Sequence, residues 1–193
     1  TQAFVFLDEQ FLTTRLDVVD VENDAPTATD LTETVLEDGS VLITLTGNDS
    51  DGNPLTFQIQ NPPSNGQLSS IIQINANSAS VIYTPNVDYN GNDSFTYTSN
   101  DAQVNSSAAN VNLVVTSVND QPSFIANTTV NVLKDSGPYS EIWATALSAG
   151  PSDESSQVLS FNISNVTNSG LFSVSPVVDS SGNLSFTVTQ NIS

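Results

Sequence analysis

One short segment occurs twice in this chain, at residues 21–26 (Val-Glu-Asn-Asp-Ala-Pro) and again at residues 118–122 (Val-Asn-Asp-Gln-Pro). The chain also continues alike after each copy, because residues 34–38 are echoed by residues 131–135. Self-similarity at a fixed period is typical of repeated structural units. The sequence therefore predicts tandem domains joined at these two segments, and one period of about a hundred residues has to hold a complete fold.

Within each period, apolar and polar residues alternate in short runs that Gly, Asn, Asp and Pro separate. The runs lie at residues 41–45, 55–59, 80–84, 94–97 and 110–115, and again at 141–144, 158–163, 171–174 and 184–188. Such runs at regular spacing indicate antiparallel Greek-key β-sandwiches. No stretch keeps a 3.6-residue period without turn residues, so a helical fold is excluded. We expect an all-β protein built of tandem sandwiches.

The repeats predict three parts. Residues 21–118 form a complete sandwich, and residues 119–193 form an incomplete one that lacks its last two strands. Residues 1–20 match residues 94–116 in order and spacing, so we expect a hairpin that belongs to an adjacent sandwich. An open sandwich exposes sheet edges, which must be paired or covered. We expect Phe4, Phe6 and Leu16 to enter the core that this hairpin completes.

The charge of the chain excludes several functions. Two basic residues stand against 21 acidic ones, a formal net charge of −19, and nucleic-acid binding demands the opposite sign. Neither Cys nor His occurs, which removes disulfides, zinc sites and the usual general base. No nucleophile and base stand in a recognisable frame, so we expect no enzyme. The sequence holds no membrane span. A surface with this much negative charge either keeps the protein soluble in a salty medium or binds divalent cations.

Five acidic motifs in order resemble the cadherin-like repeats of large bacterial surface adhesins. The junction at residues 22–26 is similar to the cadherin linker. The other motifs are the early glutamate, the aspartate pair after the second strand, the acidic triplet before the sixth strand and the aspartate of the last loop. In this chain they fall on Glu37, on Asp49 and Asp51, on Asp88 and Asn90, and on Asp101. The resemblance covers residues 20–120 well and the rest more loosely, and it implies cadherin- or Ig-like sandwiches.

The resemblance also implies calcium between consecutive domains, since calcium takes six to eight oxygen ligands from carboxylates, amides and carbonyls. The first junction would use Asn23, Asp24, Asp49, Asp51 and Asp101, with groups of the preceding sandwich. The second would use Glu37, Asp88, Asn90, Asn119, Asp120, Asp153 and Glu154, joined by Asp8 if residues 1–20 complete the second repeat. The alternative is that the Asp-Gly and Asn-Gly turns only reverse the chain.

Lys134 departs from the pattern, because it stands where the first repeat has Glu37. An ammonium group cannot ligate calcium. The far end of the second repeat therefore either lacks a full site or uses the lysine as an internal counter-ion.

These patterns favour an extracellular structural or adhesive protein at the cell surface, a calcium-stiffened rod. In one version it is a filament subunit that joins copies of itself head to tail, completing its neighbour with residues 1–20. In the other it is an excerpt of a long single-chain adhesin. The competing class is a module that binds cell-surface glycans or proteins. It would rest on Tyr139 and Trp143, although a buried strand position explains this tryptophan better.

Overall fold

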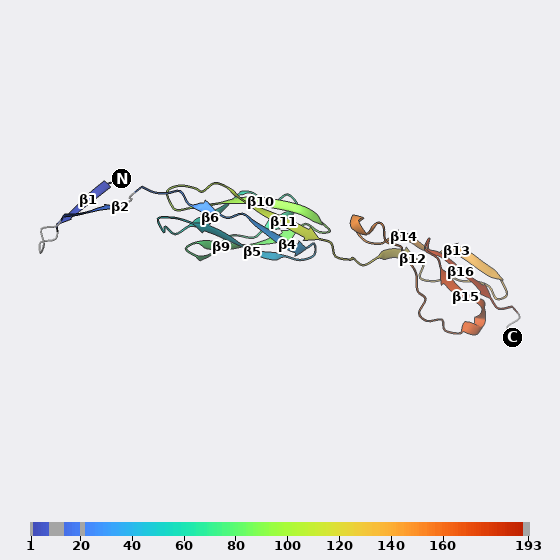
Figure 1. Ribbon diagram of the computed structural model, residues 1–193. Helices are drawn as coiled ribbons and strands as arrows, with labels where there is room; N and C mark the ends of the chain where they lie inside the picture. Colours follow the sequence, from blue (N-terminus) through green and yellow to red (C-terminus); the bar gives the residue numbers. More distant parts are fainter. Residues whose placement is uncertain (1, 8–13, 20–21, 191–193) are drawn as a thin grey trace. The chain divides into compact units, whose positions relative to one another are not determined.

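The computed structural model describes residues 2–7, 14–19 and 22–190 of the chain (Figure 1). Contacts divide the chain into two compact units, Thr1–Ser117 and Val118–Ser193, which we call unit 1 and unit 2. The predicted boundary after residue 118 lies one residue from this division. None of the described helices is long and apolar enough to cross a membrane.

The amino-terminal part is a two-stranded hairpin of β1 (Gln2–Leu7) and β2 (Thr14–Val19). In the described part of the chain these strands pair only with each other. The register sets Val5 opposite Leu16 and Phe4 opposite Asp17. Because positions alternate between the two faces of a strand, Leu16 shares a face with Val5 and lies on the other face from Phe4 and Phe6. The expected grouping of Phe4, Phe6 and Leu16 on one face is therefore wrong by this register.

The rest of unit 1 is a sandwich of two sheets, with strand orders β4-β11-β10-β6 and β3-β5-β9-β7, β8 pairing with β9. Its strands are β3 (Thr27–Ala28), β4 (Leu31–Leu36), β5 (Val41–Asn48), β6 (Thr56–Asn61), β7 (Gly66–Leu68), β8 (Ile72–Asn75), β9 (Ser78–Pro85), β10 (Gly91–Asn100) and β11 (Ala109–Thr116). The all-β class is confirmed. One pairing is parallel, that of β4 with β11. The cause is that the first strand is split: β3 joins β5, and β4 continues onto the other sheet.

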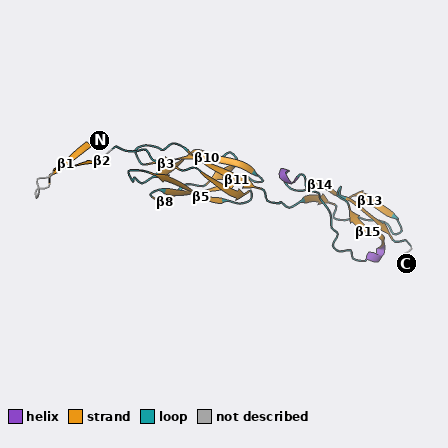
Figure 2. Cartoon of the chain, in the orientation of Figure 1, coloured by secondary structure: helices purple, strands orange, loops and turns teal. Residues whose placement is uncertain are grey.

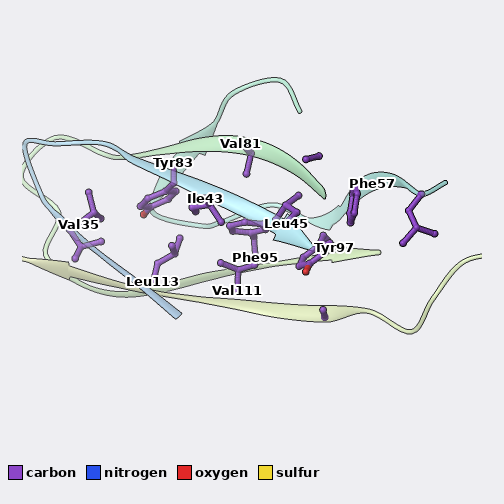
Figure 3. Packing of buried hydrophobic residues seen from close by; sticks show 14 residues of the cluster. Val35, Ile43, Leu45, Phe57, Val81, Tyr83, Phe95, Tyr97, Val111 and Leu113 are labelled. Atoms are coloured by element: carbon purple, nitrogen blue, oxygen red, sulfur yellow. The ribbon is translucent and has the colours of Figure 1, made fainter. Parts of the chain in front are cut away.

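The core of unit 1 lies between these two sheets and follows the predicted alternation. Figure 3 shows Phe95, Val111 and Leu113 of one layer facing Ile43 and Leu45 of the other. Each of these side chains is at most 1% exposed. Because such burial is worth about 1.5–3 kcal/mol for each large apolar side chain, this continuous cluster is the main stabilising feature of unit 1.

Tyr83 and Asp93 form a buried polar pair that ties this core to a turn. The Tyr83 hydroxyl donates to Asp93 Oδ2 at 2.8 Å, and the backbone N–H groups of Ser64, Asn65 and Ser94 donate to the same carboxylate. Burial by itself would raise the pKa of Asp93, but these hydrogen bonds hold it below its usual value. Burial, followed by the contact with Asp93, raises the pKa of Tyr83.

Unit 2 contains β12 (Ser123–Ala126), β13 (Pro138–Ile142), β14 (Ala144–Ser148), β15 (Phe172–Val178) and β16 (Asn183–Val188), with 3₁₀ turns at Ser152–Glu154 and Ser169–Leu171. The sheet orders are β12-β14 and β13-β16-β15. Residues 158–163, predicted as a strand, are loop; Figure 2 shows the stretch between β14 and β15 as loop and short helical turns. Among its described residues, only Ala144, Phe186 and Val188 are buried apolar side chains.

The aromatic residues of unit 2 pack against one another. Trp143 lies at the break between β13 and β14, partly exposed, which differs from the buried strand position expected for it. Its ring contacts those of Phe124 and Phe161, and Tyr139 stacks on Phe186 with ring centres 4.8 Å apart. Both rings of the alternative sugar platform are thus engaged within the unit.

The Asp93 cluster predicts how unit 1 responds to acid. Since its pKa is lower in the folded than in the unfolded chain, Asp93 contributes stability in full above pH of about 4, and loses it as the pH falls through the folded-state value. We expect Asp93→Asn to lower the free energy of unfolding at pH 7 by about 1–3 kcal/mol and to flatten the decline on acidification. Urea unfolding at pH 7 and pH 3 measures both.

Glu33→Gln removes the same charge from a partly exposed position of β4 and serves as the control. An Asp93→Asn variant that keeps the full acid sensitivity of the parent would contradict this account. Asp101, whose pKa is also lowered, leaves a residual slope.

Candidate metal-binding sites

The five residues expected at the first junction come together in the structure, all within unit 1. Asn23 and Asp24 precede β3, Asp49 and Asp51 lie in the turn that follows β5, and Asp101 follows β10. The Asn23 amide donates to Asp101 Oδ2 at 2.7 Å. The Asp24 backbone N–H donates to Asp51 Oδ2 at 2.8 Å. Strand ends that are distant in sequence thus gather their acidic residues at one end of the sandwich.

Asp49 has the most unusual environment of the five. Its side chain is 8% exposed, and Oδ1 accepts hydrogen bonds from the backbone N–H groups of Asp51 and Asn53, both at 3.0 Å. Its other oxygen, Oδ2, is buried and has no hydrogen-bond partner. A buried carboxylate oxygen without a partner carries a desolvation cost that a bound cation would offset.

Asp101 is held in its ionised form. The backbone N–H of Val104, the Asn23 amide and the backbone N–H of Gln103 donate to it and keep its pKa below the usual value, against the effect of desolvation. A carboxylate that stays charged to low pH is a suitable cation ligand.

Three further polar residues belong to this cluster and were missed by sequence reasoning. Ser50 donates to Asp24 Oδ2 at 2.9 Å, and the amides of Asn53 and Gln103 donate to Asn23 Oδ1 at 3.4 and 2.6 Å. Asn53 could have been found, because it continues the Asp-x-Asp-x-Asn alternation of the turn. Gln103 carries no such signal.

Within the ranges that the structure describes, no three acidic side chains converge closely enough to hold a metal ion as they stand. Amide, hydroxyl and backbone donors meet several of the carboxylate oxygens instead. The donor set nevertheless fits calcium, which accepts carboxylate and amide oxygens together.

The far end of unit 1 holds Glu37, Asp88 and Asn90. The Asn90 amide donates to Glu37 Oε2 at 3.2 Å, and Glu37 is 3% exposed. Asp88 adopts a left-handed backbone conformation, with φ 57°. Glu37 and Asn90 are thus in contact, as the resemblance implied, in the part of the predicted second site that belongs to unit 1.

Unit 2 supplies the other residues of that site. The backbone N–H of Asp120 donates to Glu154 Oε1, and Asn119 accepts a hydrogen bond from the Gln157 amide at 3.0 Å. Glu154 is 3% exposed, and its Oε2 has no hydrogen-bond partner. Asp153 is exposed, and Asp8 lies outside the described residues. The two predicted parts lie in different units.

Gly150 leaves the space that the Glu154 carboxylate occupies. A Cβ at this position would lie 2.8 Å from Glu154 Cδ and 3.3 Å from Asp120 Cβ. The φ angle of Gly150, +152°, is also one that residues with a side chain rarely adopt.

Gly150→Ala should therefore displace Glu154 and break its hydrogen bond with the Asp120 N–H, lowering the stability of unit 2 by about 1–3 kcal/mol. Amide hydrogen exchange at Asp120 reports the local loss. Gly170→Ala is the control, because nothing lies within 4 Å of the added Cβ there. Unchanged protection of Asp120 in Gly150→Ala would contradict this geometry.

One protein-family model matches part of the chain. Residues 23–114, just under half of the chain, match the family model Big_9, described as the bacterial Ig domain. The fold is therefore the Ig-like β-sandwich over this segment, and the finer cadherin-like assignment stays a prediction. A comparison with curated proteins finds no match.

The solved structures that are similar to the chain include the following three. Endo-fucoidan hydrolase MfFcnA4 from glycoside hydrolase family 107 is 23% identical, with 52% of this chain and 15% of that chain covered and a TM-score of 0.38. Endo-fucoidan hydrolase MfFcnA9 of the same family is 16% identical, with 58% of this chain and 21% of that chain covered and a TM-score of 0.39. The Yersinia pseudotuberculosis adhesin InvE is 16% identical, with 86% of this chain and 51% of that chain covered and a TM-score of 0.38. The chain spans about half or less of each, and these scores support no argument about function.

Proposed function

We propose that this chain is a non-catalytic segment of an extracellular structural or adhesive protein, a rod of Ig-like sandwiches stiffened by calcium at the cell surface. The observation that carries the proposal is the buried, unpartnered Oδ2 of Asp49 within the cluster of acidic residues at one end of unit 1. The match of residues 23–114 to the bacterial Ig domain supports a modular, non-enzymatic role.

Electrostatics supports a divalent ion as the ligand. Four carboxylates, those of Asp24, Asp49, Asp51 and Asp101, share one end of the sandwich in a chain of net charge −19. Like charges in such proximity repel, and desolvation of Asp49 adds to the cost. A calcium ion bound by these carboxylates and the Asn23 amide oxygen would neutralise part of that charge. It would also fix the turn after β5 against the segment before β3.

The other predicted ligands extend this proposal to the second junction. Glu37, Asp88 and Asn90 would serve from unit 1, and Asn119, Asp120, Asp153 and Glu154 from unit 2, with Asp8 of the hairpin. The unpartnered Oε2 of Glu154 is the supporting observation there, parallel to that of Asp49.

The partner that we propose is a second copy of the chain, joined head to tail through residues 1–20. A contact between two different surfaces that does not close on itself generates an open filament. The support is that the described β1–β2 hairpin pairs with no other strand. The alternative is a longer single-chain adhesin in which neighbouring residues of the same polypeptide fill that role.

Calcium binding at the first junction can be tested by substitution of Asp49. We expect calcium to raise the melting temperature of the purified chain and to bind measurably in titration calorimetry. Asp49→Asn should weaken binding at this junction at least about tenfold, or about 1.4 kcal/mol, because it removes the buried charge. In the absence of calcium it should not destabilise unit 1, since the buried carboxylate is uncompensated there.

Glu33→Gln, which removes one partly exposed negative charge from the same unit, controls for the overall change in charge and should leave calcium binding unaltered. Equal calcium binding by the Asp49→Asn variant and the parent, or none by the parent, would overturn the assignment.

A further inference from the structure

In unit 1, the β10–β11 hairpin holds two other strands in place. The sheet order β4-β11-β10-β6 puts it in the middle, with β11 parallel to β4 and β10 antiparallel to β6. Within the described residues, β4 and β6 have no other strand neighbour in their sheet. Both owe their extended, hydrogen-bonded form to this hairpin.

The corresponding segments of unit 2 have no such partner. Residues 131–135 repeat residues 34–38, and residues 158–163 hold the place in the second repeat that β6 holds in the first. Neither segment is a strand. No backbone–backbone hydrogen bond between described residues involves positions 128–132 or 158–166. Leu133 is 81% exposed and Val158 90% exposed. Leu133 and Val158 thus stand in solvent, and the described residues at 128–132 and 158–166 form no ladder with another strand.

Two apolar hollows lie beside these segments. One, of about 350 Å³, is lined by Val132, Leu133, Lys134, Leu171, Phe172 and Val188. The other, of about 490 Å³, is lined chiefly by Phe124, Trp143, Phe161, Ile163, Val178 and Leu184. Phe161 already packs edge-on against Phe124, with ring centres 5.2 Å apart, which anchors the second segment. Beside both segments, unit 2 therefore presents apolar side chains that line open hollows.

We propose that the β1–β2 hairpin of a second copy inserts into unit 2 between residues 129–134 and residues 158–163. There β2 pairs in parallel with the first segment and β1 pairs antiparallel with the second, which reproduces the four-stranded sheet of unit 1. This inference rests on the proposed assembly of copies and adds the acceptor site, the strand pairing and the orientation of the hairpin.

The register of the hairpin determines which face enters. Val5 lies opposite Leu16 and Ala3 opposite Val18, so four apolar positions share one face. In unit 1 the inward face of β10–β11 likewise sets Phe95 opposite Val111. The other face of the hairpin sets Phe4 opposite Asp17 and Phe6 opposite Arg15, a mixed pattern that suits the outer surface. In such an insertion the main-chain hydrogen bonds of the added strands give affinity, and the side chains of the apolar face give specificity.

Charge complementarity favours the same occupant. Residues 1–20 contain four acidic residues and one basic residue, and Lys134, the only basic residue of unit 2, lines the first hollow. In a chain with 21 acidic residues, a lysine at the acceptor favours an acidic insert. Attraction of the acidic hairpin would thus be the role of Lys134, which stands where the first repeat has Glu37.

A complementation experiment with two full-length double variants tests the inference. Val5→Glu with Leu16→Glu impairs the donor face, and Leu133→Glu with Val158→Glu impairs the acceptor at positions exposed enough to tolerate the change. Leu42→Glu with Val87→Glu, at exposed positions of unit 1, is the matched control. Sedimentation and electron microscopy measure assembly in calcium, and Trp143 fluorescence reports whether unit 2 is folded.

We expect the parent and the control to form open-ended assemblies and each impaired variant alone to remain monomeric. A mixture of the two impaired variants should form one-to-one dimers, because each supplies the part that the other lacks. Lys134→Glu should weaken assembly at least tenfold and Lys134→Arg should not, which keeps the test decisive if the acceptor variant fails to fold.

The outcomes separate this inference from the proposed function. If the parent assembles but the mixture stays monomeric, or if an impaired variant assembles like the parent, the acceptor site is wrong while assembly of copies stands. If the parent is monomeric at every concentration, assembly of copies is wrong as well, and calcium binding at Asp49 is decided by its own experiment.

Discussion

A β-hairpin placed between two edge strands is the interaction on which the architecture of unit 1 depends. Because β10–β11 bonds to β4 on one side and β6 on the other, it creates a whole sheet and the inner face that closes the core. The described part of unit 2 has a two-stranded and a three-stranded sheet, neither with a hairpin between two edge strands, and it buries few apolar side chains. A further strand in unit 2 would supply hydrogen bonds to backbone groups that belong to no ladder and would also cover its exposed apolar side chains.

Acidic residues are concentrated where the sandwiches begin and end. Turns at strand ends can hold aspartate and asparagine, because these residues tolerate the turn geometry and cap backbone N–H groups. The same turns bring Asp49 and Asp101 to one end of unit 1, at a cost in repulsion and desolvation. The unpartnered oxygens of Asp49 and Glu154 lie in the two units at positions where the resemblance implied ligands. Cation binding and hairpin insertion would thus complete different parts of the same repeat.

Much of the fold could be predicted from local patterns. Alternation identified the runs that became β5, β6, β9, β10 and β11. The second repeated junction lies where contacts divide the chain, between Ser117 and Val118. Residues 158–163 were predicted as a strand and are loop, because alternation reports a suitable surface and not the presence of a partner. Asn23, Asp24, Asp49, Asp51 and Asp101, expected at one site, lie at one end of unit 1. Gln103 was missed because no short-range pattern marks it.

The sequence by itself determined the all-β class, the repeat and the acidic turns, since these follow from the period of apolar residues and from residue types that local geometry requires. Only the tertiary structure decided which oxygens are buried without partners, which face of the hairpin each residue occupies, and which strands lack a neighbour. Leu16 illustrates the difference: its apolar character is local, but its face depends on the register with β1. Register and burial are properties of pairs of segments, and a linear pattern does not contain them.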